Sequence, residues 1–199
     1  ILGEIALKAG FPPGVLNVVA GKGSTVGKAL VSHPEVDIVA FTGSLEVGRR
    51  LLELSSRSPI IKKNVLELGG KGPVIVEPDC NFEETVKGVA DGLMLNTGQV
   101  CCAQTRLILS EKISDKFLKA LAKELESRKF GDILDSSTQI GSMINLEQLE
   151  KVDKIVKDSV AAGATLLCGG KRVTDPPFDK GAFYEPTVLA GVTPDMRIF

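Results

Sequence analysis

The hydrophobic and polar residues in the first third of the chain alternate between two patterns. Three short apolar runs, each bordered by glycine or proline on at least one side, predict buried strands at Val15 to Ala20, Val36 to Thr42 and Val65 to Leu68. Helical spacing predicts helices between them, over Ser24 to Ser32 and Leu45 to Ser55. The order strand, helix, strand, helix, strand is typical of an α/β fold, with a parallel sheet and right-handed crossover connections.

A second series of strands and helices follows Gly70. Strands are expected at Pro73 to Val76, Leu107 to Leu109, Thr165 to Cys168 and Phe183 to Leu189, and helices after the capping pair Asn81 and Glu84, from Ser114, and over Leu146 to Ala161. Their expected inward faces are Phe82, Val86, Val89 and Leu93; Phe117, Leu118, Leu121 and Leu125; and Leu149, Val152, Val156 and Val160. Because the pattern restarts after the glycines at 69 to 72, that stretch is a candidate domain boundary.

Composition and charge narrow the classes of function. The 199 residues are enough for one sizeable domain or two small ones, and the net charge of −1 favours neither nucleic acid nor an anionic membrane. No apolar run of 18 or more residues and no leader pattern is seen, so neither a spanning helix nor a secretory signal is expected. The four cysteines form no C-x-x-C pair, and reduced thiols in a cytoplasm are the simplest interpretation. With His33 as the single histidine, no metal site is expected.

Two glycine-containing turns are candidate phosphate sites. Gly21 to Gly27 is expected to join a strand to a helix, where glycine lets a phosphate approach the backbone. Its third glycine comes one residue later than in the usual dinucleotide fingerprint, so a turn that needs glycine for backbone geometry alone remains an alternative. Phe41-Thr42-Gly43-Ser44 repeats the arrangement, with Ser44 at a helix N-cap, and a plain capping role for Ser44 also remains open.

A carboxylate and two thiols are the candidate reactive groups. Glu67, in Leu66-Glu67-Leu68-Gly69-Gly70-Lys71, points away from its leucine neighbours and is either a paired structural charge or a base at the end of a strand. Cys101 and Cys102, in Gly98-Gln99-Val100-Cys101-Cys102-Ala103, follow a turn, so that one thiol can face a cleft while the other faces packed residues. Cys80 and Cys168 are expected to be inert core residues. A Cys-His hydrolase is disfavoured because His33 precedes Pro34 at the end of a helix.

The last three of these motifs, Phe41 to Ser44, Leu66 to Lys71 and Gly98 to Ala103, resemble in this order those of the aldehyde dehydrogenase superfamily. The resemblance covers essentially all 199 residues. It implies an aldehyde dehydrogenase-like α/β fold in which residues 1–70 are the later part of a Rossmann-type NAD(P)-binding domain and residues 71–199 are most of the catalytic domain. The G-Q-x-C pattern assigns the nucleophile to Cys101, and the L-E-L-G-G-K pattern makes Glu67 the base that activates the deacylating water. The residues implied to contact NAD or NADP are Gly23, Gly43, Ser44, Leu68 and Gly69, with Gly48 serving helix packing.

The same resemblance implies an NAD(P)-dependent oxidation of an aldehyde to a carboxylic acid through a cysteine thiohemiacetal and thioester. The full-length enzyme is then expected to be a cytoplasmic homo-oligomer, a dimer or a tetramer, that binds a small aldehyde. The chain spans less than half of the usual family length and lacks the family's upstream asparagine and ribose-binding lysine, so residues 1–199 alone are expected to be inactive or very weak. A coenzyme A-acylating aldehyde dehydrogenase and a non-catalytic α/β binding module remain the alternatives.

Overall fold

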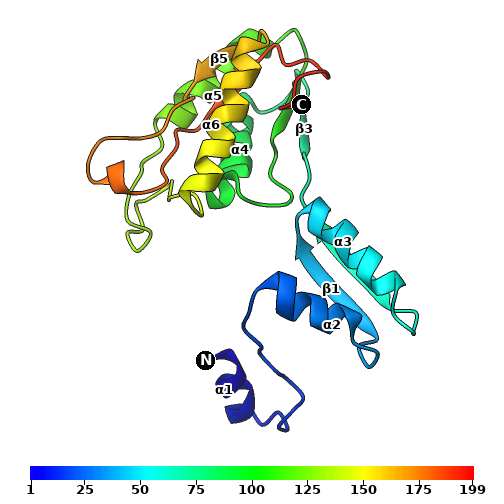
Figure 1. Ribbon diagram of the computed structural model, residues 1–199. Helices are drawn as coiled ribbons and strands as arrows, with labels where there is room; N and C mark the ends of the chain where they lie inside the picture. The colour runs from blue at the N-terminus through cyan, green and yellow to red at the C-terminus, as the bar shows by residue number, and fades with distance from the viewer. The chain divides into compact units, whose positions relative to one another are not determined.

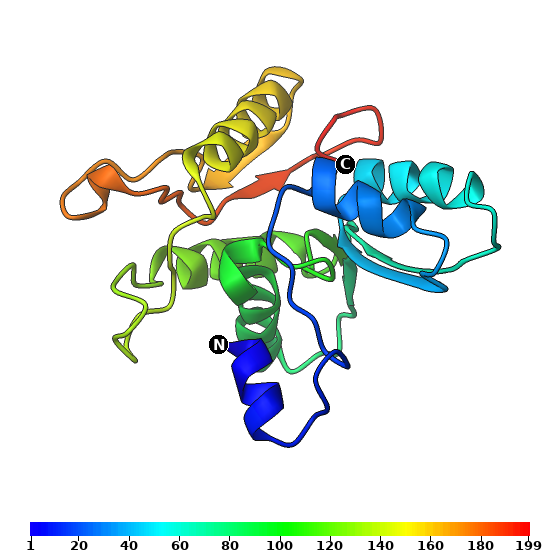
Figure 2. The same ribbon diagram turned by 60° about the horizontal axis from the view of Figure 1, so that its bottom comes forward.

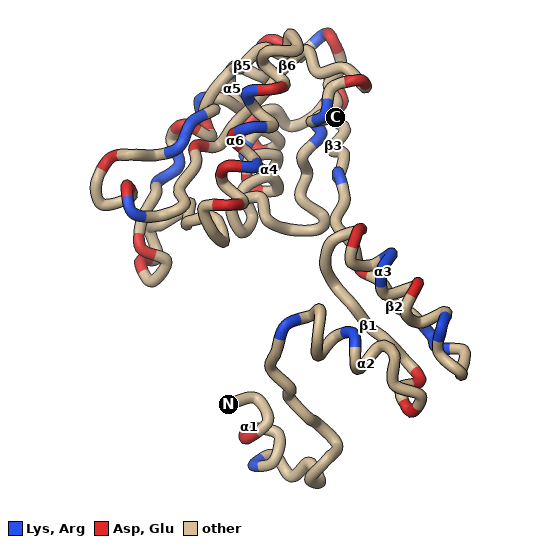
Figure 3. The backbone as a smooth tube through the Cα atoms, in the orientation of Figure 1, with Lys and Arg blue, Asp and Glu red and all other residues tan.

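The computed structural model describes residues 1–199 and divides into two compact units, Ile1–Gly69 and Gly70–Phe199 (Figures 1 and 2). Each unit combines helices with short strands, as the α/β expectation requires. Basic and acidic residues are interspersed along the chain in both units (Figure 3). None of the helices has the length and apolarity needed to cross a lipid bilayer. The assignment of one unit to the coenzyme and of the other to catalysis stays a prediction.

The first unit is built around a parallel pair of strands. Its elements are α1 (Leu2–Lys8), the π-helical turn η1 (Gly23–Gly27), α2 (Lys28–Ser32), β1 (Ile38–Gly43), α3 (Leu45–Ser56) and β2 (Lys63–Leu68). β1 and β2 pair in parallel from Ile38 opposite Lys63 to Gly43 opposite Leu68. Val31, Val39 and Leu51 form the small core between the helices and this sheet. The parallel arrangement and the second and third predicted strands are confirmed, to within about two residues.

The predicted strand at Val15 to Ala20 is wrong. This segment is irregular, and Val15, Val18 and Val19 are each more than 60% exposed. An apolar run becomes a buried strand only when a neighbouring strand pairs with its backbone and a second layer covers its side chains. β1 and β2 pair only with each other, so this run has no such neighbour.

Local interactions define the beginning and the packing of α3. The Ser44 hydroxyl accepts a hydrogen bond from the Val47 amide at 3.3 Å, which confirms Ser44 as the N-cap. Gly48 is buried, and a methyl group in its place would lie 2.8 Å from a methyl carbon of Leu68. The absence of a side chain at Gly48 therefore lets α3 pack closely on β2.

The second unit contains two further strand pairs and three long helices. Its elements are β3 (Pro73–Val76), α4 (Phe82–Met94), the 3-10 turn η2 (Leu95–Gly98), β4 (Arg106–Leu109), α5 (Ser114–Glu126), α6 (Leu146–Ala161), β5 (Thr165–Cys168), η3 (Phe178–Lys180) and β6 (Val188–Ala190). β3 and β4 are parallel, whereas β5 and β6 are antiparallel. The predicted elements are confirmed except the last strand, which begins only at Val188; before it, Tyr184 makes an isolated bridge with Arg172.

The three helices bury most of the predicted positions. The main core contains Val76, Val86, Val89, Ala90, Phe117, Leu121, Leu125 and Cys168, and Phe82 and Leu93 pack against it. In α6 the last expected inward residue is wrong, because Val160 is 41% exposed and Ser159 is buried instead. Ser159 follows Val156 by three residues on the same helix face, and its hydroxyl donates to the Ile155 carbonyl at 2.7 Å. This hydrogen bond satisfies the Ser159 hydroxyl and so offsets the free-energy cost of removing it from water.

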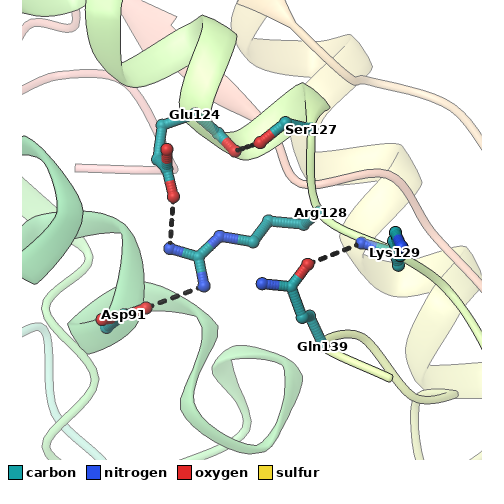
Figure 4. Close-up of polar contacts among 6 residues, drawn as sticks. All are labelled: Asp91, Glu124, Ser127, Arg128, Lys129 and Gln139. Atoms are coloured by element: carbon teal, nitrogen blue, oxygen red, sulfur yellow. Dashed lines mark hydrogen bonds and ion pairs between the residues drawn. The ribbon is translucent and has the colours of Figure 1, made fainter. Parts of the chain in front are cut away.

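Polar and charged side chains interact at the beginning of α4 and near the ends of α4 and α5. The Asn81 side chain at the start of α4 donates to the Glu84 carboxylate at 2.8 Å, so neither side-chain-to-backbone bond of the expected capping box is formed, although the helix begins where predicted. At the other end, the Arg128 guanidinium, 9% exposed, lies 2.7 Å from both Asp91 of α4 and Glu124 of α5 (Figure 4). One shielded cation thereby joins two helices that share the core.

A buried phenol should make the stability of the second unit decrease as the pH rises in the alkaline range. Tyr184 packs beside Met143 and Leu149, and its hydroxyl donates to Asp153 at 3.2 Å. Burial, and then the negative charge of Asp153, raises the pKa of Tyr184 well above its usual value. The folded state therefore favours the protonated phenol, and this contribution is complete below about pH 10, where the unfolded phenol titrates.

We expect this contribution to be lost as the pH rises above about 10 toward the raised folded pKa of Tyr184. Urea unfolding measured from pH 8 to 11 should show a steeper fall in stability for the wild type than for Tyr184→Phe. At pH 8 the variant should differ only by the lost hydrogen bond, about 1 kcal/mol. Parallel stability curves for the two proteins would exclude this role of the phenol.

Candidate active site

The carboxyl ends of β1 and β2 gather most of the predicted coenzyme residues. Leu68 lies opposite Gly43, and the Gly69 amide donates to the Gly43 carbonyl at 3.2 Å. Ser44 follows directly as the N-cap of α3. Four of the five predicted residues therefore meet at one end of the sheet, where the N-terminus of a helix favours an anion.

The fifth residue, Gly23, opens the π-helical turn η1, which precedes α2. The predicted strand before it is not formed, so the expected pair of equivalent strand-to-helix turns is reduced to one. A methyl group at Gly23 would meet nothing within 4 Å, and its φ is not positive. Neither packing nor backbone conformation therefore explains a glycine at this position.

Glu67 lies near the end of β2, opposite Thr42 of β1. Burial alternates along the strand, with Leu66 and Leu68 half-buried and Glu67 exposed. This confirms that its side chain points away from those of the two leucines. The carboxylate makes no ion pair within the protein, so the alternative of a paired structural charge has no support in this structure.

The two adjacent cysteines occupy the middle of a tight turn. The Ala103 amide donates to the Val100 carbonyl at 3.1 Å and closes the turn around Cys101 and Cys102. Both thiols are free and exposed, whereas Ala103 is buried. The expectation that one thiol would face packed residues is therefore wrong. In a four-residue turn, the two central side chains project from the corner while the last residue returns to the core.

Two glycines of the glutamate motif lie against this turn. A methyl group at Gly70 would be 3.2 Å from the Cys101 carbonyl oxygen, and one at Gly72 would be 2.7 Å from that of Ala103. The Gly72 carbonyl in turn accepts from the Arg106 amide at 3.0 Å, which continues the pairing of β3 with β4. The sequence identified both motifs but not this contact between their backbones.

The close approach at Gly72 gives a test of the packing. Gly72→Ala should destabilise the protein by about 1–3 kcal/mol, because the new methyl group would meet a backbone oxygen that cannot rotate away. Gly88→Ala is the matched control, since Gly88 is exposed in α4 and a methyl group there would meet nothing within 4 Å. It should stabilise by about 0.5–1 kcal/mol. Urea unfolding that ranks Gly72→Ala level with Gly88→Ala would contradict this packing.

The chain enters the cysteine turn through three left-handed residues. Asn96, Thr97 and Gly98 have φ values of 49°, 58° and 74°. Asparagine and glycine tolerate this conformation, but a β-branched threonine in it is an outlier that costs about 1–3 kcal/mol. The sequence predicted a turn at Thr97 and Gly98 but contained no signal for strain at Thr97.

Other ionisable groups lie nearby or in the core. Lys71, between the two contacting glycines, has a pKa lowered first by partial burial and second by the charge of Arg106. Burial raises the pKa of the Cys168 thiol, which agrees with an inert core residue. Cys80 packs against the same core. No group of three or more His, Cys, Asp or Glu side chains is arranged to hold a metal ion.

A cavity of about 860 Å³ lies in the second unit. Residues of α4, β4, α5, α6 and β6 line it, together with Thr97, Gly98 and Gln99. Cys101 and Cys102 are not among its lining residues, so this cavity does not coincide with the exposed thiols.

The motifs, the turn and the parallel strands all agree with a comparison against known proteins. A model of the aldehyde dehydrogenase family matches residues 1–199. The chain belongs to the aldehyde dehydrogenase family. The curated relatives of this chain include a mitochondrial aldehyde dehydrogenase of Leishmania tarentolae, 40% identical over 197 residues, and human retinaldehyde dehydrogenase 3, 41% identical over 197 residues. The alignments cover 99% of the chain but only 39% and 38% of these relatives.

Solved structures of family members show the same fold. An NAD-dependent aldehyde dehydrogenase from Sinorhizobium meliloti is 43% identical and superposes with a TM-score of 0.92 over 99% of this chain and 38% of its own. Betaine aldehyde dehydrogenase from Staphylococcus aureus, solved in complex with NAD⁺, is 36% identical with a TM-score of 0.94 over 99% and 39%. The expected aldehyde dehydrogenase-like α/β fold is confirmed.

Proposed function

We propose that this chain provides the thiol nucleophile, the base and part of the coenzyme site for NAD(P)-dependent oxidation of an aldehyde to a carboxylic acid. Family membership supports the reaction class, and the contact between the two motifs supports the assignment of residues. Gly70 lies against the Cys101 carbonyl, and Glu67 precedes Gly70 by three residues. Three peptide units span at most about 11 Å between Cα atoms. Chain connectivity therefore keeps the Cα atom of Glu67 within that distance of Gly70, and this observation carries the proposal.

The end of the first sheet fits the coenzyme's phosphates. Ser44 caps the Val47 amide, while the Leu45 and Glu46 amides at the first turn of α3 have no partner in the protein. Free amides at a helix N-terminus bind anions, and Gly23 offers an open approach from η1. The S. aureus relative was solved with NAD⁺, and an Escherichia coli relative is described as NADP dependent. We therefore propose NAD or NADP, held by Gly23, Gly43, Ser44, Leu68 and Gly69.

The proposed chemistry begins at Cys101. Its thiolate attacks the aldehyde carbon, forming a carbon–sulfur bond and an oxyanion, and the backbone amide of Cys101 is the donor that we propose for that charge. The bound coenzyme supplies the acceptor for the hydride that the thiohemiacetal loses. Cys101 then holds the acyl group as a thioester. Glu67 takes a proton from water, the resulting hydroxide attacks the thioester carbon, and the carboxylic acid leaves as the carbon–sulfur bond breaks.

Product analysis tests this proposal against coenzyme A acylation. A full-length protein that carries these residues, given acetaldehyde and either NAD or NADP, should release acetate and reduced coenzyme in a 1:1 ratio, with or without coenzyme A. Formation of acetyl-coenzyme A in place of acetate would establish the acylating alternative. We expect residues 1–199 alone to form no measurable reduced coenzyme, and turnover by this chain would contradict that expectation.

We also propose that the full-length enzyme is a homo-oligomer, a dimer or a tetramer. Family membership supports this proposal; large apolar residues such as Ile61, Ile75 and Leu134 are exposed in residues 1–199, where either the rest of the protein or a second copy can cover them. A cytoplasmic location remains part of the proposal, while the L. tarentolae relative is described as mitochondrial.

A further inference from the structure

Reciprocal hydrogen bonds join Asn96, the first residue of the left-handed segment before the cysteine turn, to Gln99, which directly follows that segment. The Gln99 amide donates to the Asn96 carbonyl at 3.1 Å, and the Asn96 side chain donates to the Gln99 carbonyl at 3.2 Å. The Gln99 side-chain amide donates to the same Asn96 carbonyl at 3.3 Å. These bonds hold the segment in one conformation, but they do not by themselves fix where it lies in the fold.

Its place in the fold is fixed by bonds to a distant segment. The Gln99 side-chain oxygen accepts from the Ile144 amide at 2.9 Å, across 45 residues of sequence. Thr97 makes a second, longer bond to the Gly141 carbonyl at 3.4 Å. The bond from Gln99 has the better geometry, so most of the attachment depends on this one side chain.

The segment that receives Gln99 is itself well anchored. Met143 is buried, and its amide donates to the Ala182 carbonyl at 2.8 Å. Asn145 caps α6 by accepting from the Gln148 amide at 2.8 Å. Gln99 therefore connects the cysteine turn to the beginning of a sixteen-residue helix.

We propose that Gln99 is a positioning residue for Cys101, which holds the thiol turn in place through its side-chain bond to Ile144. This inference rests on the proposed function, in which Cys101 is the nucleophile. Gly70 and Gly72 support the turn from the other side, against the Cys101 and Ala103 carbonyls. The thiol itself is exposed and has no side-chain bond of its own, so its position depends on these backbone supports. A displacement of about 1 Å at a reacting group can cost 10²-fold in rate.

Two substitutions at Gln99 separate the bonds. Gln99→Met keeps the length of the side chain but removes its acceptor, whereas Gln99→Glu retains an oxygen that can accept from Ile144. Gln139→Met is the matched control, because the Gln139 side chain also accepts a backbone amide, that of Lys129 at 3.1 Å (Figure 4). All three are made in a full-length protein that carries these residues.

We expect Gln99→Met to lower kcat per active site about 10–100-fold, with KM for the coenzyme unchanged. Active sites are counted by labelling Cys101 with iodoacetamide, so that loss of folded protein is not read as a slower reaction. Gln99→Glu should stay within about threefold of the wild type, and Gln139→Met within about twofold. Hydrogen exchange at the Ile144 amide should accelerate in Gln99→Met but not in Gln99→Glu.

Wild-type kcat per labelled site in Gln99→Met would overturn this role, and so would an equal loss in Gln139→Met. Cys101→Ala distinguishes this failure from that of the proposed function. If Cys101→Ala is inactive while Gln99→Met is normal, only the role of Gln99 is wrong. If Cys101→Ala remains active, the nucleophile assignment fails, and the role of Gln99 fails with it.

Discussion

Cys101→Ala should lower aldehyde oxidation by at least about 10⁴-fold in a full-length protein that carries these residues, because it removes the proposed nucleophile of the covalent route. Cys102→Ala is the matched control, since both thiols are free and exposed in the same turn. We expect Cys102→Ala to keep kcat within about threefold of the wild type. Initial rates of NAD(P)H formation at saturating acetaldehyde and coenzyme measure both effects.

Thiol labelling provides the second readout for this prediction. A limiting amount of iodoacetamide should inactivate the enzyme in proportion to the alkylation of Cys101, as found by peptide mass spectrometry. Inactivation that follows alkylation of Cys102 or Cys168 would reassign the nucleophile. Full activity after complete alkylation of Cys101 would favour the non-catalytic α/β binding module for this chain, with catalysis located elsewhere in the protein.

Glu67→Gln should separate the two halves of the reaction. The amide has nearly the shape of the carboxylate but cannot take a proton from water, so hydrolysis of the thioester should slow by about 10²–10⁴-fold. Formation of the thioester should persist. We expect a rapid burst close to one reduced coenzyme per active site, followed by a slow steady state, and an acyl group on Cys101 detectable by mass spectrometry.

An added nucleophile checks the assignment of Glu67. Hydroxylamine attacks a thioester without a general base, so it should restore turnover in Glu67→Gln and release the hydroxamate. Glu53→Gln is a suitable control, because Glu53 is an exposed carboxylate in the same unit, in the last turns of α3 and away from its N-terminus. A variant at Glu67 that lacks the burst would place its role before the thioester, and an unchanged steady state would exclude it as the base.

Periodicity predicted most of the fold because helices and buried strands leave local patterns. α6 was predicted to the residue, and the parallel pairing of β1 with β2 followed from the order of elements. The strand at Val15 to Ala20 failed because a strand forms only when another strand pairs with it, and pairing is not a local property. Val160 failed because the inward face of a helix drifts, and a small hydroxyl residue next to it could be buried.

The site was predictable as motifs but not as geometry. Glu67 and Cys101 were recognised from their chemical types and flanking residues. The backbone contact of Gly70 and Gly72 with the cysteine turn, and the bond from Gln99 to Ile144, join residues 30 to 45 positions apart. From sequence alone, a glycine in a motif indicates a flexible turn, and a glutamine indicates a polar residue in contact with solvent. Only the folded chain shows that both lie beneath or beside the exposed thiols.

The boundary between the two compact units falls between Gly69 and Gly70, yet Gly70 already contacts the cysteine turn. The tripeptide Gly70-Lys71-Gly72 therefore belongs structurally with the turn that carries Cys101 and Cys102, although the L-E-L-G-G-K pattern groups part of it with Glu67. A chimera that exchanges residues 1–69 between family members should be joined at or before Gly69. A junction three residues later would replace Gly70, Lys71 and Gly72, and with them the backbone that lies against the cysteine turn.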